Sequence, residues 1–350
     1  MAAKPITLST ESRGKRIPKL PSDTSIYLQG STSDLYARLA KDTGLPATRL
    51  RITSDGKPVP NDKKITVASA GLQSGSKIQV KDLGPQIAWR TVFVIEYLGP
   101  LLIHPLFYLL RPYLYKGATS VPSSLQFLSC LTITLHFIKR ELETLFVHRF
   151  SNATMPATNI FKNSFHYWIL SGLLIAYFTY SPTSITAGEG SPLLTYTGLA
   201  LFAFGELANL NTHLTLRNLR SPGGTERGIP KGLGFDWVTC PNYLFETIAW
   251  IGIMLINRSW TTAVFVVVAG GQMALWAKKK ESRYRKELGS KYKKKRFAML
   301  PGVWSGGKPD EELCPLNFEL QRMTGKVYLG DAKFGLMLHH HQPDSASPSQ

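Results

Sequence analysis

Hydrophobic positions are distributed very unevenly along this chain. Both ends are polar and charged, whereas much of the region between Ile87 and Ala277 is apolar and rich in aromatic side chains. Several windows in that region approach the roughly 20 residues that a helix needs to cross a hydrocarbon core. The pattern therefore predicts a mainly α-helical, polytopic membrane protein.

Six apolar segments are the candidates for these spans. The first contains two ionisable residues, Glu96 and His104, and two prolines that are expected to bend it. The fifth is short for a full crossing, so it is either tilted, re-entrant or extended towards Leu233. The segments are Ile87–Leu110, Leu125–Ile138, Phe165–Tyr180, Leu193–Leu210, Tyr243–Ile256 and Trp260–Ala277.

Basic residues alternate between the connections of these segments. The connection near 181–192 has none, those at 139–164 and 211–242 have about four each, and Lys278–Arg296 has eleven. By the positive-inside rule, this alternation predicts that both termini are cytoplasmic. The net charge of +18 is thus explained by a cluster flanking the membrane, where it can contact anionic lipid, and nucleic-acid binding is not expected.

Several site classes are disfavoured. The three cysteines are far apart, match no metal spacing and predict no disulfide framework. No Gly-x-Gly-x-x-Gly follows a strand, so a soluble Rossmann site is excluded. His339–His341 lie in a polar tail without Cys or acidic partners. No metal site is predicted, and the polar N-terminus predicts no cleaved signal peptide.

The first 84 residues predict a small α+β domain. Strands are expected at Ile6–Ser9 and Lys15–Leu20, and a helix at Thr32–Thr43 closed by Gly44. Alternation at Arg49–Thr53 leads into a turn at 54–58, and Lys77–Lys81 alternates again. This order resembles the β-grasp fold of ubiquitin. Because the last strand continues towards a membrane segment, we expect a docking or regulatory module rather than a conjugated one.

The predicted domains are 1–84, a membrane domain at 85–301, and a polar, disordered tail at 302–350.

One stripe of polar residues continues the fourth apolar segment. Asn209, His213, Arg217 and Arg220 are spaced four, four and three apart, which places them on one helix face. Guanidinium groups in such a stripe suit phosphates. Contact of the arginines with lipid headgroups is an equally supported interpretation.

Two further stretches carry ionisable groups at membrane depth. In the stretch His136–Asn163, Lys139 and Arg140 lie four and three residues before Glu143, so they can pair on a helix surface. Such groups face either a bundle interior or, as a solvated juxtamembrane helix, water. In the stretch Cys240–Glu246, Asn242 and Glu246 share a face beside Tyr243. Tyr243 is either an aromatic anchor at the interface or a proton donor.

Five sequence stretches together resemble one family. They are GPQIAWRTVFVIEYLGP, HFIKRELETLFVHRFSNATMPATNIFKN, LRNLR, CPNYLFE and WAKKKESRYRKELGSKYKKKRFAMLPG. The chain resembles trans-2-enoyl-CoA reductases, the last enzymes of microsomal very-long-chain fatty acid elongation, over about six-sevenths of its length. It is more distantly similar to steroid 5-alpha-reductases.

The resemblance implies a multi-pass enzyme of the endoplasmic reticulum membrane, a helical bundle with six or seven spans, that uses NADPH. It implies partners in elongation, namely the elongase, the ketoacyl-CoA reductase and the hydroxyacyl-CoA dehydratase, and a link to sphingolipid metabolism. Hydride passes to C3 of the enoyl thioester and a protein acid protonates C2. By motif, the implied cofactor-binding residues are Asn209, His213, Arg217, Arg220, Arg227, Asn242, Glu246 and Tyr284, and the implied catalytic or substrate residues are Gln86, Glu96, Lys139 and Tyr243.

Tyr243 is the expected acid, with Lys139 or Glu96 easing its proton transfer. The steroid reductases carry a proton-delivering tyrosine in a His-Tyr motif, where this chain has His136-Phe137. Phe137 cannot donate a proton, which shifts that role to Tyr243. Two alternatives stay open at this point: a reductase of another alkene, such as a steroid or polyprenol, and a non-enzymatic membrane adaptor that presents the N-terminal domain.

Overall fold

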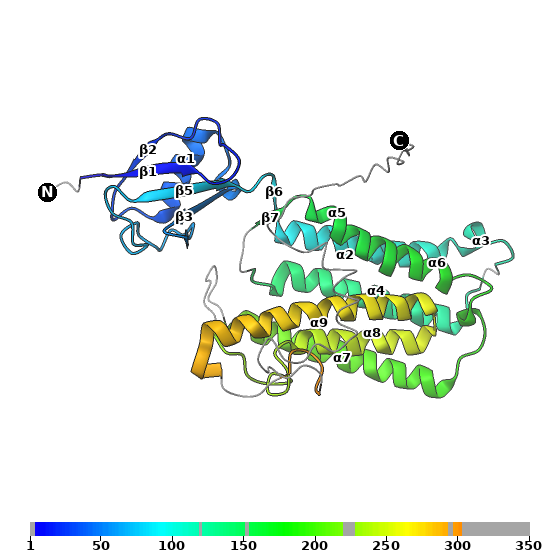
Figure 1. The fold of residues 1–350 in the computed structure, drawn as a ribbon. Coiled ribbons are helices and arrows are strands. Elements are labelled where there is room, and N and C mark those ends of the chain that lie inside the picture. Colours follow the sequence, from blue (N-terminus) through cyan, green and yellow to red (C-terminus); the bar gives the residue numbers. More distant parts are fainter. Residues whose placement is uncertain (1–3, 119–120, 151–153, 220–227, 293–296, 303–350) are drawn as a thin grey trace, which may run out of the picture.

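The computed structural model describes residues 4–118, 121–150, 154–219, 228–292 and 297–302. Figure 1 shows an N-terminal α+β domain followed by a bundle in which α2, α4, α7, α8 and α9 run alongside one another. The described part of the chain is mainly helical, as the sequence predicts. The predicted tail, beyond Gly302, lies outside the described residues.

The N-terminal domain is built on a five-stranded sheet with strand order β2-β1-β5-β3-β4. The strands β1 and β5 are parallel, and the other neighbours are antiparallel. One helix packs on the sheet over a core that includes Leu8, Leu35 and Ile52. The elements are β1 (Ile6–Ser12), β2 (Asp23–Ile26), α1 (Thr32–Thr43), η1 (Ala47–Arg49), β3 (Leu50–Ser54), β4 (Lys57–Val59) and β5 (Lys77–Asp82).

Helix α1 begins and ends where the sequence predicts. At its start the Ser31 hydroxyl accepts from the Asp34 amide, and the Asp34 carboxylate accepts from the Ser31 amide, so two otherwise unpaired groups are satisfied. At its end Gly44 adopts φ 71°, a left-handed conformation that favours glycine.

One predicted strand is wrong. Lys15–Leu20 forms a connection, and the strand that pairs with β1 is Asp23–Ile26. Pro18 has no amide hydrogen for a ladder, and Lys19 has φ 59°, which no strand residue adopts. Within this connection the apolar side chain of Ile17 is buried in the domain core.

The bundle contains all six predicted apolar segments as helical structure. Three of the described helices, α2, α7 and α9, are long and apolar enough to cross a membrane. The predicted third span, Phe165–Tyr180, is mostly π-helical. The elements are α2 (Trp89–Leu109), α3 (Arg111–Leu114), α4 (Ser124–Leu142), η2 (Glu143–Val147), α5 (Asn159–Ser164), η3 (Phe165–Leu174), α6 (Ile175–Thr179), η4 (Ile185–Ala187), α7 (Pro192–Asn218), α8 (Pro241–Asn257), α9 (Trp260–Leu288) and η5 (Gly289–Tyr292).

Glycines bring α7 and α8 into close contact. A Cβ on Gly205 would lie 2.5 Å from the Ala249 amide nitrogen, and one on Gly252 would lie 2.5 Å from the Gly198 carbonyl oxygen. Small residues at such a crossing allow two helix backbones to approach. Asn209 of α7 is thereby placed against the first turns of α8, where it contacts Asn242 and Glu246.

A short two-stranded ribbon lies directly before the first helix of the bundle. Strand β6 (Gln86–Ala88) pairs antiparallel with β7 (Thr154–Pro156). The Trp89 indole donates to the Thr154 carbonyl at 3.1 Å. Two of the motifs identified in the sequence, far apart along the chain, are thus joined at the start of α2.

Candidate active site

Lys139, on α4, is surrounded by three polar side chains. Its Nζ lies 2.7 Å from Asn209 Oδ1, 3.0 Å from Glu143 Oε1 and 3.0 Å from Glu206 Oε2. Asn209 and Glu206 come from α7, one turn apart. The Lys139 ammonium therefore joins two helices through one amide and two carboxylates inside the bundle.

Lys139, Glu143, Glu206 and Asn209 form a polar network inside the bundle. His136, one turn before Lys139, extends this network to α8. Its Nδ1 lies 2.5 Å from Glu206 Oε1, and its Nε2 lies 3.5 Å from Glu246 Oε1. His136 is buried, and its ring packs edge-on against Trp250. The imidazole thus bridges carboxylates from two neighbouring helices.

Asn209 connects the two polar stripes that the sequence predicts. Its Nδ2 donates to the Asn242 carbonyl at 2.8 Å and to Glu246 Oε2 at 3.0 Å. Asn209, Asn242 and Glu246 therefore lie together, although 33 and 37 residues separate the last two from the first.

Arg140 links the network to α2, and it also lies 3.4 Å from His213 of α7. Its Nη1 donates to Glu143 Oε2 at 2.6 Å, and its Nη2 donates to the Tyr97 hydroxyl at 3.1 Å. Glu246 lies 3.8 Å from Nη1. Glu96, next to Tyr97 in sequence, is only 1% exposed, so the one carboxyl group of α2 is also buried near Arg140.

The structure assembles more residues than the sequence analysis selects. His136, Glu206 and Tyr97 take part and are not among the predicted site residues. Arg140 and Glu143 also take part, and the predicted pairing is confirmed: Glu143 lies 2.6 Å from Arg140 and 3.0 Å from Lys139. The predicted stripe that begins at Asn209 could have been extended back to Glu206. That residue lies three positions before Asn209 and seven before His213, on the same helix face. Tyr97 and His136 carry no comparable signal, since their roles depend on which helices become neighbours.

Other predicted site residues lie around the network. The Tyr243 ring packs towards α9, 6.4 Å from that of Trp276, and within the described residues its hydroxyl has no hydrogen bond. Gln86 donates to the Leu83 and Gly84 carbonyls in the β6 ribbon. Tyr284 stacks edge-on with Tyr292 near the end of α9.

The remaining cofactor candidates divide into two groups. Arg217 is half-buried on α7, and its carbonyl accepts from Arg149 at 3.2 Å. Arg220 and Arg227 lie outside the described residues. Thus the network brings together Lys139, Asn209, Asn242, Glu246 and His213, whereas Gln86 and Tyr284 contact other residues.

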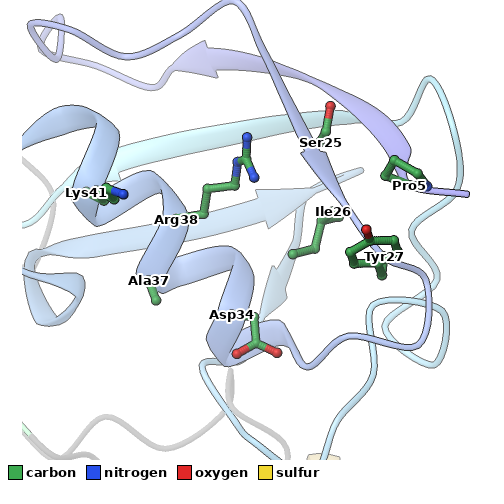
Figure 2. Close-up of a pocket in the computed structure, with 8 residues that line it drawn as sticks. All are labelled: Pro5, Ser25, Ile26, Tyr27, Asp34, Ala37, Arg38 and Lys41. Atoms are coloured by element: carbon green, nitrogen blue, oxygen red, sulfur yellow. The ribbon is translucent and has the colours of Figure 1, made fainter.

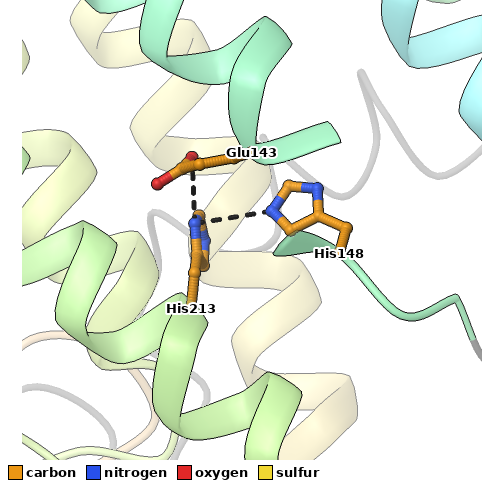
Figure 3. Close-up of side chains that lie close together, drawn as sticks. All are labelled: Glu143, His148 and His213. Atoms are coloured by element: carbon orange, nitrogen blue, oxygen red, sulfur yellow. Dashed lines mark hydrogen bonds and ion pairs between the residues drawn. The ribbon is translucent and has the colours of Figure 1, made fainter. Parts of the chain in front are cut away.

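Figure 3 shows Glu143, His148 and His213 converging at the end of α4. His213 Nδ1 lies 3.0 Å from Glu143 Oε2 and 3.4 Å from His148 Nε2. Burial lowers the pKa of His148, which lies outside the spans in the loop after η2, to about 3, so its ring is neutral at physiological pH.

Two histidines and a carboxylate form a set that could ligate a metal. Here, however, Arg140 lies 2.6 Å and Lys139 lies 3.0 Å from the Glu143 oxygens. A divalent ion would have to sit beside two cations that already neutralise the carboxylate. The geometry therefore fits a hydrogen-bonded ion-pair cluster.

Four buried atoms of the network lack a hydrogen-bond partner in the described part of the chain: Glu143 Oε1, Glu206 Oε2, Asn242 Oδ1 and Arg140 Nε. The two carboxylate oxygens are each ion-paired with Lys139 at 3.0 Å, whereas Asn242 Oδ1 and Arg140 Nε have no such contact among the described residues. A buried polar group without a partner is costly, so such atoms are suited to receive a bound polar molecule. The site thus offers an amide oxygen and a guanidinium N–H to a ligand.

Comparison with known proteins places this site in a family. Residues 153–304 match the family described as 3-oxo-5-alpha-steroid 4-dehydrogenase. A very-long-chain enoyl-CoA reductase of Dictyostelium discoideum is 40% identical over 279 residues, covering 77% of this chain and 91% of that protein. The chain belongs to the very-long-chain enoyl-CoA reductase family.

Two further relatives also have names that refer to enoyl reduction. A Schizosaccharomyces pombe protein named as an enoyl reductase is 45% identical over 85% of this chain and 98% of its own length. The human trans-2,3-enoyl-CoA reductase-like protein is 33% identical over 68% of this chain and 67% of its own length. This reductase is therefore an oxidoreductase acting on a CH–CH group and a multi-pass membrane protein, and the adaptor alternative is set aside.

Proposed function

We propose that this protein reduces very-long-chain trans-2-enoyl-CoA to saturated acyl-CoA with NADPH, as the last step of a fatty acid elongation cycle. The observation that carries the proposal is the network of Lys139, Asn209, Asn242 and Glu246, shared by α4, α7 and α8. Ionisable residues buried among membrane helices are costly and usually functional. The names of the relatives supply the substrate class.

The residues proposed to hold NADPH fit a nucleotide in their chemistry. Asn209 and Asn242 provide amides, His213 provides an imidazole, and the unpaired Asn242 Oδ1 is an acceptor for an N–H group. Arg217, together with Arg220 and Arg227 outside the described residues, would hold the phosphates. Glu246 and Tyr284 complete the proposed set. When bound, NADPH supplies the hydride that adds to C3.

Tyr243 is the proposed acid. It follows Asn242 in the first turn of α8 and precedes Glu246 by one turn, so it borders the network. As hydride adds to C3, the electron pair of the C2=C3 bond moves towards the thioester carbonyl. Transfer of the Tyr243 hydroxyl proton to C2 then gives the saturated product, and the tyrosinate regains a proton from water. Lys139 and Glu96 are proposed to ease this transfer electrostatically, and Gln86 to contact the substrate.

Reduction of a steroid by the mechanism of steroid reductases is not supported. Phe137 occupies the position of their tyrosine, is fully buried, and packs edge-on against Trp250 and Tyr167. It has no proton to donate.

The fold of the N-terminal domain, the membrane topology and the cellular location are also proposals. The sheet order β2-β1-β5-β3-β4 with one packed helix supports a ubiquitin-like domain. The basic cluster Lys278–Arg296, which begins in the last turns of α9, supports cytoplasmic termini, six spans and an endoplasmic reticulum location beside the other elongation enzymes. It could also steer the polyanionic coenzyme A.

The test uses microsomes that lack their own enoyl-CoA reductase. They are supplied with this protein, NADPH and a very-long-chain trans-2-enoyl-CoA, and the saturated acyl-CoA is measured by mass spectrometry. We expect product only when the protein and NADPH are both present. Absence of product, with no NADPH oxidation by correctly inserted protein, would refute the proposed function. An enone steroid in parallel tests the substrate class.

A further inference from the structure

Strand β2 forms an open edge of the N-terminal sheet. It pairs only with β1, and within the described residues no other backbone hydrogen bond involves Asp23–Ile26. An edge strand presents a row of unpaired N–H and C=O groups that can add a further strand. Charges, prolines or a covering element often block such edges. The four-residue strand β2 begins with the charged Asp23, but Thr24, Ser25 and Ile26 carry no charge and no proline.

A hollow of about 530 Å³ lies between this edge and helix α1. Its apolar wall is formed by Ile26, Tyr27 and Ala37, and Figure 2 shows these side chains on both sides of the gap. Tyr27 is 55% exposed, so its ring is accessible from solvent at the mouth of the hollow. The hollow is therefore able to receive apolar side chains next to a free strand edge.

The rim of the hollow is basic. Arg38 and Lys41 are both exposed on α1, and neither forms an ion pair within the described residues. The acidic residue of the lining, Asp34, is already bonded to the Ser31 amide and hydroxyl at 3.0 and 2.8 Å. Moreover, residues 1–84 carry fourteen Lys and Arg against seven Asp and Glu.

We propose that this edge binds an extended peptide of a partner protein, with short apolar β-forming residues flanked by acidic residues. The peptide adds as a strand next to β2, its apolar side chains enter the hollow, and its acidic residues meet Arg38 and Lys41. Main-chain hydrogen bonds provide affinity in this mode, and the hollow and the rim provide specificity. The proposal is independent of the proposed catalytic function, because the hollow shares no residue with the network.

The test measures binding of a labelled peptide to the full chain in detergent, by fluorescence polarisation. The probe has four alternating Val and Ile residues followed by four acidic residues. We expect saturable binding, weakened about tenfold or more in Arg38→Glu/Lys41→Glu, because like charges then face each other. The matched control, Arg51→Glu/Lys57→Glu, reverses two exposed charges on β3 and β4 and should bind as the parent does.

A second probe tests the strand edge without changing the protein. Methylation of alternate peptide amides removes hydrogen-bond donors while retaining side chains and charge, and we expect it to abolish binding. Equal binding of the methylated probe, or equal loss in both double variants, would overturn the proposal. So would binding that appears only after truncation following Gly302, since the chain's own segment would then be the occupant. Reductase activity should be unchanged in Arg38→Glu/Lys41→Glu.

Discussion

Lys139 Nζ lies 2.7 Å from the side-chain oxygen of Asn209, and the amide nitrogen of Asn209 donates to Glu246 Oε2 at 3.0 Å. This chain of contacts fixes the orientation of the Asn209 amide, since the cation takes its oxygen and the carboxylate takes its nitrogen. It also joins α4 to α8 through a residue of α7. Disturbing any of the three helices should therefore alter one shared site.

Removal of the Lys139 charge should destabilise the bundle. In Lys139→Gln, Glu143 and Glu206 lose a cation at 3.0 Å, and breaking such a buried pair typically costs on the order of 3 kcal/mol. We expect a lower melting temperature in detergent and loss of turnover. The double variant Lys139→Gln/Glu206→Gln should recover part of the stability, because one uncompensated charge is gone. Lys116→Gln, at an exposed lysine, should behave as the parent protein; equal stability of all variants would contradict the network.

Substitution of Tyr243 should separate chemistry from binding. In Tyr243→Phe the ring and its packing against Trp276 remain, while the proton is lost. General acid catalysis typically contributes about 10²–10⁴-fold, so kcat should fall at least about 100-fold. NADPH affinity, measured by fluorescence titration, should stay within about twofold. Tyr196→Phe, at an exposed position of α7, is the control. Retention of most activity in Tyr243→Phe would show that another group is the acid.

Increasing the separation of α7 and α8 should impair the candidate active site indirectly, because both helices contribute residues to it. In Gly205→Ala the new methyl group would lie 2.5 Å from the Ala249 nitrogen and 2.7 Å from the Phe245 carbonyl, and backbone atoms cannot easily yield. Overpacking of this kind costs about 1–3 kcal/mol, so we expect a lower melting temperature and weaker NADPH binding.

Gly270→Ala is the matched control for this helix contact. A Cβ on Gly270, in α9, would meet no atom within 4 Å, so the substitution should leave stability unchanged or raise it, since alanine favours helix more than glycine. If both variants behave alike, close packing of α7 on α8 does not position the site.

The ion pair at the end of the N-terminal domain should make that domain weakly sensitive to acid. The Arg49 guanidinium, 2.6 Å from Asp82, together with the Gly84 amide, lowers the pKa of Asp82 below its ordinary 3.8. A depressed carboxyl pKa contributes stability above the ordinary value and loses it as pH falls through the lowered one.

Asp82→Asn should therefore reduce the protection of β3 and β5 amides from hydrogen exchange at pH 7. The difference from the parent protein should be small, because both groups are partly exposed, and it should vanish as pH falls well below 3.8. A difference that persists at low pH would assign the effect to something other than the charge of Asp82.

The N-terminal domain shows how far local patterns reach. The capping residues of α1, the alternation of β3 and β5 and the turn at Gly56 predict those elements correctly, because each depends on neighbours a few residues away. The second strand is predicted wrongly at Lys15–Leu20, because Pro18 has no amide hydrogen to donate and Lys19 has φ 59°, and Asp23–Ile26 pairs with β1 instead. A strand forms only where its backbone can pair with a neighbouring strand.

In the membrane bundle, periodicity alone determines that polar residues such as Asn209 and His213 share one face, and that Asn242 and Glu246 share another, because the helical repeat is a local property. Only the tertiary structure decides that these faces meet, and that His136, Tyr97 and Glu206 complete the network. The physical reason is that a contact between two helices depends on their crossing angle and separation. Here small residues such as Gly205 determine that angle and separation, because Gly205 packs against the backbone of Ala249, more than forty positions away in the sequence.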